Sequence, residues 1–236
     1  MLNKILETCE AALEDVKDGA IIMISGFGRA GLPLQLIDAL VAQGARDLTI
    51  ISNNSGSDDS GFGALIRQKR VRKLICSFPR LAGATLFDAA YRAGEVELEV
   101  IPQGTLAERM RAAGAGIGGF YTPTAYGTRL AEGKESRKIE GKNYIFELPL
   151  KADYALVKAH CADQWGNLTY RMSGRNFGPI MASAATTAIA QVSEIVPLGA
   201  LNPEAVVSPG IFVKRVVQVS SFPANRAETL ETRSQK

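Results

Sequence analysis

The sequence predicts an α/β fold of three layers, in which helices cover both faces of a mostly parallel sheet. Short apolar runs alternate along the chain with amphipathic segments of helical spacing, which is the pattern of repeated strand–helix units. The apolar runs are continuous rather than alternating, as expected for strands buried on both faces. A length of 236 residues with 46% apolar composition is enough to bury a sizeable core.

The first elements are a helix, a strand and a second helix. Apolar residues at helical spacing predict a helix over residues 3–17. Residues 20–24 form an unbroken apolar run after an Asp-Gly turn, which predicts the first buried strand. Pro33 then opens an amphipathic segment and Gly44 closes it, so the second helix is expected between them.

The alternation of strands and helices continues to residue 113 and resumes near residue 153. In the first part, strands are expected at 47–52, 71–77 and 96–101, and helices at 62–68, 86–93 and 105–113. In the second part, strands are expected at 153–159, 194–197 and 213–219, and a helix at 180–190. Ligands of such folds bind where the parallel strands end, so candidate site residues are sought there.

The segment 114–150 interrupts this alternation. Residues 114–123 are rich in glycine and show neither a helical nor a strand period. Residues 138–147 have the pattern of a hairpin that turns about Gly141. We therefore expect 114–150 to form an inserted flap or small subdomain.

The remaining bulk features favour one domain over residues 1–220. Residues 221–236 are polar and are expected to form a flexible tail. The net charge is only +3 and the basic residues are dispersed, which argues against a nucleic-acid partner. The longest apolar runs are far shorter than a membrane span, which argues against a membrane partner.

The chain has three cysteines, Cys9, Cys76 and Cys161, without the spacing of a metal site. Cys9 and Cys76 lie in apolar stretches, so buried, reduced thiols are expected. The first residues lead into a predicted helix rather than a signal peptide. These features favour a cytoplasmic protein that holds no metal.

The loop between the first strand and the second helix is a candidate binding element. Gly26, Gly28 and Gly31 permit unusual backbone angles and a close approach of a ligand to the main chain. The helix that begins at Pro33 would direct its free N–H groups towards an anion. A plain tight turn explains the same glycines. The spacing is neither that of a dinucleotide-binding loop nor that of a P-loop.

Three amides and one imidazole are the other candidates. Gln103 follows a predicted strand, and Asn53 and Asn54 follow another, where each amide either contacts a ligand or satisfies loop backbone. The lone His160 has Asp163 nearby in sequence. A single such pair favours a structural histidine over a catalytic one.

The run 18–33 resembles the signature of the alpha (A) subunit of family I CoA-transferases, and departs from it at Ser25, where a glycine is usual. If that glycine needs a positive φ, Ser25 is strained or the loop is reshaped. The resemblance extends over about residues 3–219. Further stretches that carry it are 46–54, 102–109, 166–170, 175–177 and 182–184.

This resemblance implies an enzyme that moves CoA from an acyl-CoA such as succinyl-CoA to a 3-oxoacid by covalent catalysis. The family's nucleophile is a glutamate in a Ser-Glu-Asn-Gly motif of the B subunit, and no matching motif occurs in this sequence. The chain is therefore expected to be half of an enzyme, paired with a B subunit in a heterodimer or an A2B2 heterotetramer. CoA would be a substrate, and no tightly bound cofactor is implied.

The resemblance also implies roles for particular residues. Gln103 would support the acyl site as an oxyanion donor. The glycine-rich loop would bind CoA or line the acyl site, through Ile24, Ser25, Gly26, Phe27, Gly28, Arg29, Ala30 and Gly31. Gln103 would also contact the substrate, and Asn53 is expected to do so from its place at the end of a neighbouring strand.

The acceptor expected from the resemblance is 3-oxoadipate, because the segments 78–80 and 175–182 look more like enzymes of aromatic degradation than like acetoacetate enzymes. A second carboxylate distinguishes 3-oxoadipate from acetoacetate, and an arginine can pair with it. Arg80 is the first candidate and Arg29 the second. Acetoacetate, or butyrate–acetoacetate, transfer is the alternative activity, and a non-catalytic metabolite-binding module is the alternative of another class.

Overall fold

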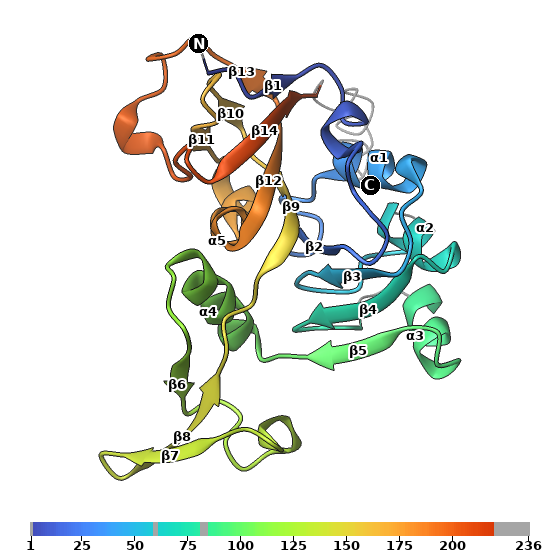
Figure 1. Ribbon diagram of the computed structural model, residues 1–236, viewed down its shortest axis with the longest axis vertical. Coiled ribbons are helices and arrows are strands. Elements are labelled where there is room, and N and C mark those ends of the chain that lie inside the picture. The colour runs from blue at the N-terminus through green and yellow to red at the C-terminus, as the bar shows by residue number, and fades with distance from the viewer. Residues whose placement is uncertain (1, 59–60, 81–84, 220–236) are drawn as a thin grey trace, which may run out of the picture.

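The computed structural model describes residues 2–58, 61–80 and 85–219, and a single large sheet runs through its centre (Figure 1). Eight strands pair in the order β1-β14-β12-β9-β2-β3-β4-β5, and every pairing is parallel. The predicted α/β class is confirmed. The strands are β1 (Ile5–Leu6), β2 (Ile21–Ile24), β3 (Leu48–Ile51), β4 (Val71–Cys76), β5 (Glu97–Val100), β9 (Ala152–Lys158), β12 (Ala185–Val192) and β14 (Val213–Gln218).

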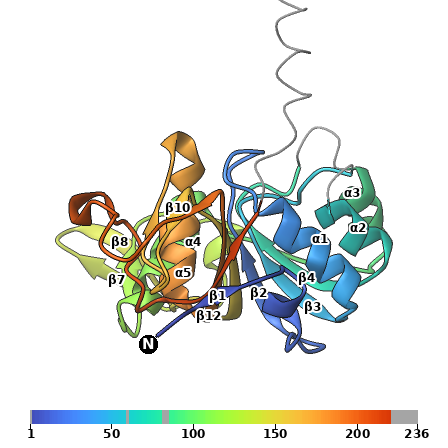
Figure 2. The ribbon, with the colours of Figure 1, turned by 90° about the horizontal axis from the view of Figure 1, so that it is seen from above.

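Helices cover both faces of this sheet, as predicted (Figure 2). Successive residues of one strand enter different cores: Ile22 and Ile24 pack on one face and Met23 on the other. This is the period of two that a strand buried on both sides requires. One face carries α1 (Leu34–Gln43), α2 (Gly61–Arg67) and α3 (Thr85–Arg92), and the other carries α4 (Gln103–Gly114) and α5 (Gly178–Ala184).

The first strand–loop–helix unit forms as its sequence predicts. In β2, Ile22, Met23 and Ile24 are each at most 1% exposed. Pro33 immediately precedes α1, and Gly44 ends that helix in the left-handed conformation with φ of +101°.

The order of the strands reverses direction at β2. From β2 the chain adds β3, β4 and β5 on one side, and later adds β9, β12 and β14 on the other. In open parallel sheets, ligands bind at such a switch point, outside the carboxyl ends of the strands. The loop that follows β2 therefore lies at the expected place for a site.

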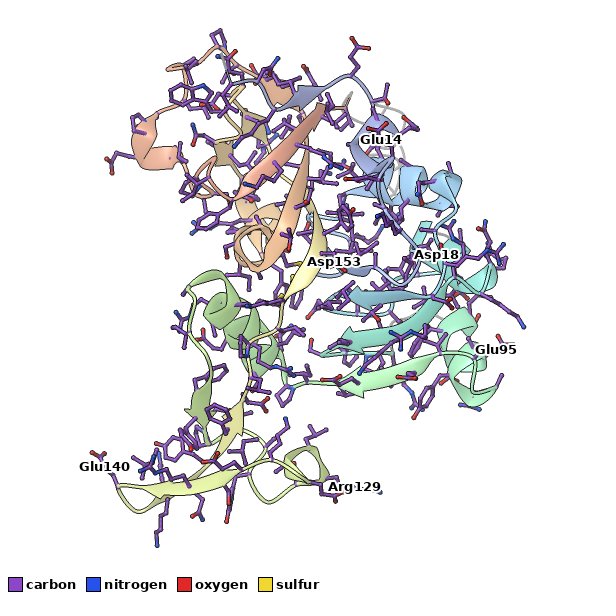
Figure 3. All side chains as sticks on the ribbon, viewed as in Figure 1. Glu14, Asp18, Glu95, Arg129, Glu140 and Asp153 are labelled. Carbon is purple, nitrogen blue, oxygen red and sulfur yellow. The ribbon has the colours of Figure 1, made fainter. Side chains whose placement is uncertain are left out.

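A second, antiparallel sheet extends away from the large one beside α4 (Figure 1). It consists of β6 (Phe120–Thr122), β7 (Ser136–Ile139) and β8 (Lys142–Glu147) in the order β6-β8-β7. The predicted hairpin is confirmed, and Figure 3 shows Glu140 at its turn. The division of the chain into a domain of residues 1–220 with a flap at 114–150 stays a prediction.

A third, small sheet lies at the other end of the molecule. It is built from β10 (Cys161–Ala162), β11 (Leu168–Thr169) and β13 (Glu194–Ile195) in the order β11-β10-β13. The strand predicted at 194–197 is thus present in its first two residues but belongs to this sheet. The predicted tail at 221–236 lies outside the described residues.

The prediction of a helix over residues 3–17 is wrong. Residues Ile5–Leu6 form β1, which pairs with β14, and Ala11–Leu13 form a 3-10 helix. Cys9, Ala12 and Leu13 are nevertheless buried, because an irregular segment can bury the same apolar residues that suggested a helix.

The helix predicted at 180–190 is also wrong in its second half. It ends at Ala184, and Ala185–Val192 form β12, a strand between β9 and β14. Ala188 and Ala190 are fully buried in the core that also contains α5. The tertiary position overrides the helix propensity of these alanines.

The cysteines are free thiols, and Cys9 and Cys76 are buried as predicted, while Cys161 is half-buried. Burial, with the nearby carboxylates of Glu10 and Asp38, raises the pKa of Cys9 to about 11. Burial raises the pKa of Cys76 to about 12. No helix among the described residues is both long and apolar enough to pass through a bilayer.

Candidate active site at the carboxyl ends of the strands

A pocket of about 420 Å³ opens where four neighbouring strands end. In Figure 1 the arrowheads of β3, β4 and β5 point towards this edge, near α4. Figure 3 labels Asp18, which precedes β2, and Asp153, which is the second residue of β9. Both mark the amino ends of their strands, at the edge of the sheet away from the pocket. The lining residues follow β2, β3, β4 and β5 in turn: Phe27 and Gly28, Asn53 and Asn54, Ser77 and Phe78, and Gln103.

Gln103 and Asn53, both predicted as site residues, are hydrogen-bonded to each other across this pocket. The Gln103 Nε2 donates to Asn53 Oδ1 over 2.7 Å, and the Ser77 hydroxyl donates to the same oxygen over 2.7 Å. Asn53 is 5% exposed, whereas Gln103 is exposed at the pocket. An amide nitrogen carries two N–H groups, so one remains on Gln103 for a ligand.

The loops after β3 and β4 are joined by backbone and hydroxyl bonds. The Phe78 N–H donates to the Asn53 carbonyl over 3.0 Å, and the Ser55 hydroxyl donates to the Pro79 carbonyl over 2.6 Å. These bonds fix the rim of the pocket on either side of Asn53. Phe78 itself is 57% exposed, so its ring is available to a ligand or a second chain.

The helix end that faces the pocket is that of α4. This helix begins at Gln103, two residues earlier than predicted, directly after Pro102. Its first turn contains no acidic residue, so its positive dipole end adds to the attraction for an anion.

The prediction that the start of α1 directs its N–H groups to a ligand is wrong for Leu36. The Leu36 N–H donates instead to Oε1 of Gln191, a buried side chain of β12, over 3.1 Å. The amide of Gln191 in turn donates to Gln35 over 2.6 Å. This end of α1 is therefore capped inside the protein.

The glycine-rich loop after β2 folds back on itself before α1. Phe27 and Ala30 exchange two backbone hydrogen bonds of 2.9 and 3.1 Å, which leaves Gly28 and Arg29 at the tip. Of the predicted loop residues, Phe27 and Gly28 line the pocket. Three others, Ile24, Ser25 and Gly26, line a smaller cavity of about 20 Å³ beneath the loop.

Ser25 is not strained. Its backbone is outside the left-handed region, and the positive φ falls on the next residue, Gly26, at +134°. The Ser25 side chain is fully buried. Its hydroxyl donates to the Gly31 carbonyl over 2.8 Å and accepts from the Lys158 N–H over 3.2 Å. The hydroxyl therefore joins the end of the loop to the sheet.

Neither predicted arginine is among the described residues that line the pocket. Arg29 is exposed at the tip of the loop, one residue beyond Gly28. Arg80 is exposed two residues beyond Phe78. Their role towards the second carboxylate of an acceptor stays a prediction.

The lone histidine lies away from this pocket. His160 follows β9, and its backbone N–H donates to the Thr169 carbonyl over 2.8 Å. The Asp163 carboxylate accepts from Trp165 and Asn167 in its own loop and makes no bond to the imidazole among the described residues. The structural interpretation of His160 fits this arrangement.

The pocket offers neutral donors and no acid among the described residues that line it. Ser77 has a hydroxyl there, but it is bonded to Asn53 and no imidazole is among the lining side chains. No group of three or more histidine, cysteine, aspartate or glutamate side chains in the described ranges is placed to hold a metal ion. The pocket can thus stabilise a developing oxyanion, but its described residues supply no carboxylate nucleophile.

Sequence reasoning did not name three residues that the structure brings to this region. The segment after β4 was expected at this edge, but Arg80 was named from it as a site residue, whereas Ser77 and Phe78 are the ones that line the pocket. Asn176 lies about 150 residues from the loop that it contacts, and only its place in the stretch 175–177, which carries the family resemblance, marked it.

Comparison with known proteins places these features in a family. The family model described as coenzyme A transferase matches residues 6–219. The chain is 60% identical to the A subunit of the 3-oxoadipate CoA-transferase of Pseudomonas putida, over 95% of this chain and 97% of that protein. It is 43% identical to the A subunit of the succinyl-CoA:3-ketoacid coenzyme A transferase of Helicobacter pylori strain J99, over the full length of both.

A solved structure shares the fold at lower identity. The glutaconate coenzyme A-transferase of Acidaminococcus fermentans superposes with a TM-score of 0.80 at 19% identity, over 92% of this chain and 76% of that one. Because the family model covers nearly the whole chain and close relatives align end to end, the chain belongs to the coenzyme A transferase family.

Proposed function

We propose that this chain is one of two kinds of subunit in a CoA-transferase, the A type, and that the enzyme moves CoA from succinyl-CoA to a 3-oxoacid, with 3-oxoadipate as the acceptor. The observation that carries the proposal is the pocket at the strand ends. It contains the amide of Gln103, the first residue of α4, and no carboxylate is among the described residues that line it. Such a pocket suits one half of an acyl-transfer site.

The chemistry begins with a carboxylate of the B subunit. It attacks the thioester carbonyl of succinyl-CoA, a C–O bond forms and the C–S bond breaks, which gives a mixed anhydride and CoA thiolate. The thiolate then attacks the enzyme's own carbonyl of that anhydride and releases succinate, which leaves CoA as a thioester on the enzyme. The acceptor carboxylate resolves this thioester by the reverse sequence.

This chain would act on the oxyanion that each addition creates. The second N–H of Gln103 can donate to that oxygen while Asn53 holds the first. A neutral donor is suitable because it stabilises the charge of the transition state without forming an ion pair with the substrate's carboxylates. The positive end of α4 contributes in the same direction.

The names of the relatives support a B-type partner. Both relatives described above are named as the A component of a transferase, and this chain aligns with nearly all of each. A heterodimer or an A2B2 heterotetramer would complete the site, with CoA as substrate. Free thiols at Cys9, Cys76 and Cys161 fit a reducing compartment such as the cytoplasm.

The acceptor has one serious competitor. The Pseudomonas relative named for 3-oxoadipate is 60% identical, and the Helicobacter relative named for a 3-ketoacid is 43% identical. The higher identity supports 3-oxoadipate over acetoacetate. A non-catalytic binding module has no observation in its favour once the family is known.

The proposal is tested by measuring turnover with succinyl-CoA and each acceptor, for the chain alone and after mixing with its B subunit. We expect no turnover for the chain alone, and turnover that prefers 3-oxoadipate after mixing. Robust activity without a partner would contradict the half-enzyme proposal. A preference for acetoacetate would overturn the assignment of the acceptor.

A further inference from the structure

We propose that Asn176 is a positioning residue, which fixes the tip of the glycine-rich loop against the pocket that contains Gln103. This inference rests on the proposed function, because it assigns the loop a place in the same site. Asn176 is brought to the loop by the turn before α5, which is distant in sequence and adjacent in space.

The Asn176 amide uses its full hydrogen-bonding capacity at this junction. Its Oδ1 accepts from the Gly26 N–H over 3.1 Å and from the Phe177 N–H over 2.7 Å. Its Nδ2 donates to the Ala30 carbonyl over 3.0 Å and to the Ser173 carbonyl over 2.8 Å. An asparagine amide can accept two bonds and donate two, so this one is saturated.

Two of these four bonds reach the loop, one on each leg, and the other two hold the amide in its own turn. Gly26 lies on the leg that leaves β2, and Ala30 lies on the leg that returns towards α1. Because one rigid amide holds both legs, they cannot move apart without breaking a bond to Asn176. Aspartate has the same shape but lacks the two N–H groups, so it could hold only one leg.

Ser25 adds a second link one residue further from the tip. Its hydroxyl connects the Gly31 carbonyl of the returning leg to the Lys158 N–H of β9. The loop is therefore tied to the sheet at Ser25 and to the turn before α5 at Asn176.

Backbone packing between Gly31 and Gly174 closes this junction. A Cβ at Gly31 would lie 2.5 Å from the Gly174 carbonyl oxygen and 2.6 Å from Nδ2 of Asn176, and φ at Gly31 is +75°. A glycine is thus needed at 31, both for its backbone angle and for the close approach. The two chain segments are in direct backbone contact.

The tied legs place the tip of the loop at the pocket. Phe27 and Gly28 line it together with Gln103. Within the described part of the chain, the Gly28 N–H makes no hydrogen bond. In this proposal the Gly28 N–H serves as a second neutral donor at the pocket, and its direction depends on the bonds that hold the legs. Preorganised donors of this kind stabilise an oxyanion without reorganisation.

Asn167 provides a matched control. Its Oδ1 accepts from the Gly210 N–H over 2.8 Å and its Nδ2 donates to the Asp163 carboxylate over 2.8 Å, so it also joins two loops. It lies beside β11 and does not line the pocket. Loss of its bonds therefore reports the structural cost of removing a bridging asparagine.

The test compares N176A, N176D, S25A and N167A, each assembled with the B subunit. We expect N176A to lower kcat by roughly 10- to 100-fold relative to N167A at equal folded fraction, because small displacements of a catalytic donor have effects of this size. N176D should lose as much as N176A, and S25A should lose less in the same direction. Amide hydrogen exchange of residues 26–31 should be faster in N176A than in N167A and wild type.

The inference is overturned if exchange of residues 26–31 is the same in N176A and N167A, or if N176A loses no more kcat than N167A. The exchange measurement does not depend on any substrate. If the wild-type assembly has no transferase activity, the proposed function fails, and the exchange comparison alone then decides whether Asn176 positions the loop.

Discussion

Gln103 and Asn53 form a pair in which one amide orients the other. The oxygen of Asn53 accepts from Gln103 and from Ser77 at 2.7 Å each, so its position is set by two donors. With one N–H thus occupied, the Gln103 amide is oriented by Asn53 and its second N–H is left for a ligand. A neutral donor of this kind is what the proposed acyl-transfer site requires of this chain.

We expect Gln103→Ala to lower kcat of the assembled enzyme by roughly 10²-fold or more, the loss typical of one oxyanion donor. Gln103→Glu should lose as much, because a carboxylate has the same length but cannot donate. Turnover and the melting temperature are measured together. Unchanged turnover would reduce Gln103 to a loop residue.

Asn53 supplies the control for that prediction. If Asn53 acts by orienting Gln103, the double variant Asn53→Ala/Gln103→Ala should lose little more activity than Gln103→Ala alone. Additive losses would mean that Asn53 contacts the substrate independently. As a control at a surface position, Gln218→Ala on β14 should leave turnover unchanged.

A second side-chain prediction concerns Arg80 and the acceptor. If its guanidinium pairs with the second carboxylate of 3-oxoadipate, Arg80→Ala should lower kcat/KM for 3-oxoadipate roughly 30-fold or more and leave acetoacetate nearly untouched. The same comparison for Arg29→Ala tests the second candidate. An equal loss for both acceptors would remove either arginine from the specificity role.

The helices and strands could be predicted from the sequence wherever a local signal agreed with the tertiary position. Strand β2 and helix α1 have such signals, an unbroken apolar run and a Pro33–Gly44 frame, and both form. Residues 185–190 have conflicting signals, because alanines favour a helix while Thr186, Thr187 and Ile189 are β-branched. Their position between β9 and β14 decides for a strand, and the sequence alone does not contain that position.

The residues of the candidate site were likewise predictable only where a local signal marks them. That Gln103 and Asn53 lie together at the pocket was predictable because each follows a strand, whereas the role of Gln103 was expected from the family resemblance and stays a prediction. The contacts of Asn176 and Gln191 with the loop and with α1 were not, because each joins segments about 150 residues apart. No local pattern records such a pairing.

The C-terminal end of helix α1 is capped by a buried side chain. Arg70, 2% exposed, donates from Nε to the Ala45 carbonyl over 2.6 Å, and from its two terminal nitrogens to the carbonyls of Val41 and Leu40 over 2.6 and 2.8 Å. Leu40 and Val41 lie in the last turn of α1, and Ala45 follows its cap residue, Gly44. Carbonyls at these positions have no partner within the helix. Burial lowers the pKa of Arg70 from its ordinary value.

We expect Arg70→Met to lower the free energy of unfolding by about 2 kcal/mol, since charge-assisted bonds are lost and buried carbonyls are left unpaired. Arg70→Lys should also be destabilising, because one ammonium cannot replace the three-pronged guanidinium contact. Urea unfolding measures both. Arg72→Met, at an exposed position of β4 two residues further along the chain, is the control and should change stability by less than about 0.5 kcal/mol. Equal effects at the two positions would contradict the capping role.

Across the molecule, a chain of charges connects the large sheet to the small antiparallel one. Lys73 of β4 pairs with Glu99 of β5 at 2.7 Å, and Glu99 pairs with Arg109 of α4 at 3.3 Å. Arg109 also lies 3.9 Å from Glu147 of β8, which is 3% exposed and pairs with Lys134.

Backbone contacts reinforce this connection. The Arg109 side chain donates to the Leu148 carbonyl over 2.8 Å, and the Leu150 N–H donates to the Arg109 carbonyl over 2.9 Å. Helix α4, whose first residue is Gln103, therefore also holds the segment that links β8 to β9.

This connection predicts that stability at acid pH depends on Glu99. Burial alone would raise the pKa of Glu99, but its bonds to Lys73 and Arg109 outweigh burial and lower the pKa. A carboxyl whose pKa is lower in the folded state stabilises that state fully above the unfolded pKa, about 4.3 for glutamate. The contribution is lost as the pH falls from there through the folded pKa.

Glu99→Gln should therefore be less stable than wild type at pH 7, by at most about 1 kcal/mol because the pair is partly exposed to solvent. The difference in melting temperature should shrink as the pH falls below about 4.3, because protonation removes the same charge from wild type. Glu97→Gln, at an exposed position of the same strand, controls for the general effect of removing a carboxylate. A difference between wild type and Glu99→Gln that stays constant with pH would show that shape rather than charge carries the effect. The connection between the two sheets would then rest on the backbone contacts of Arg109.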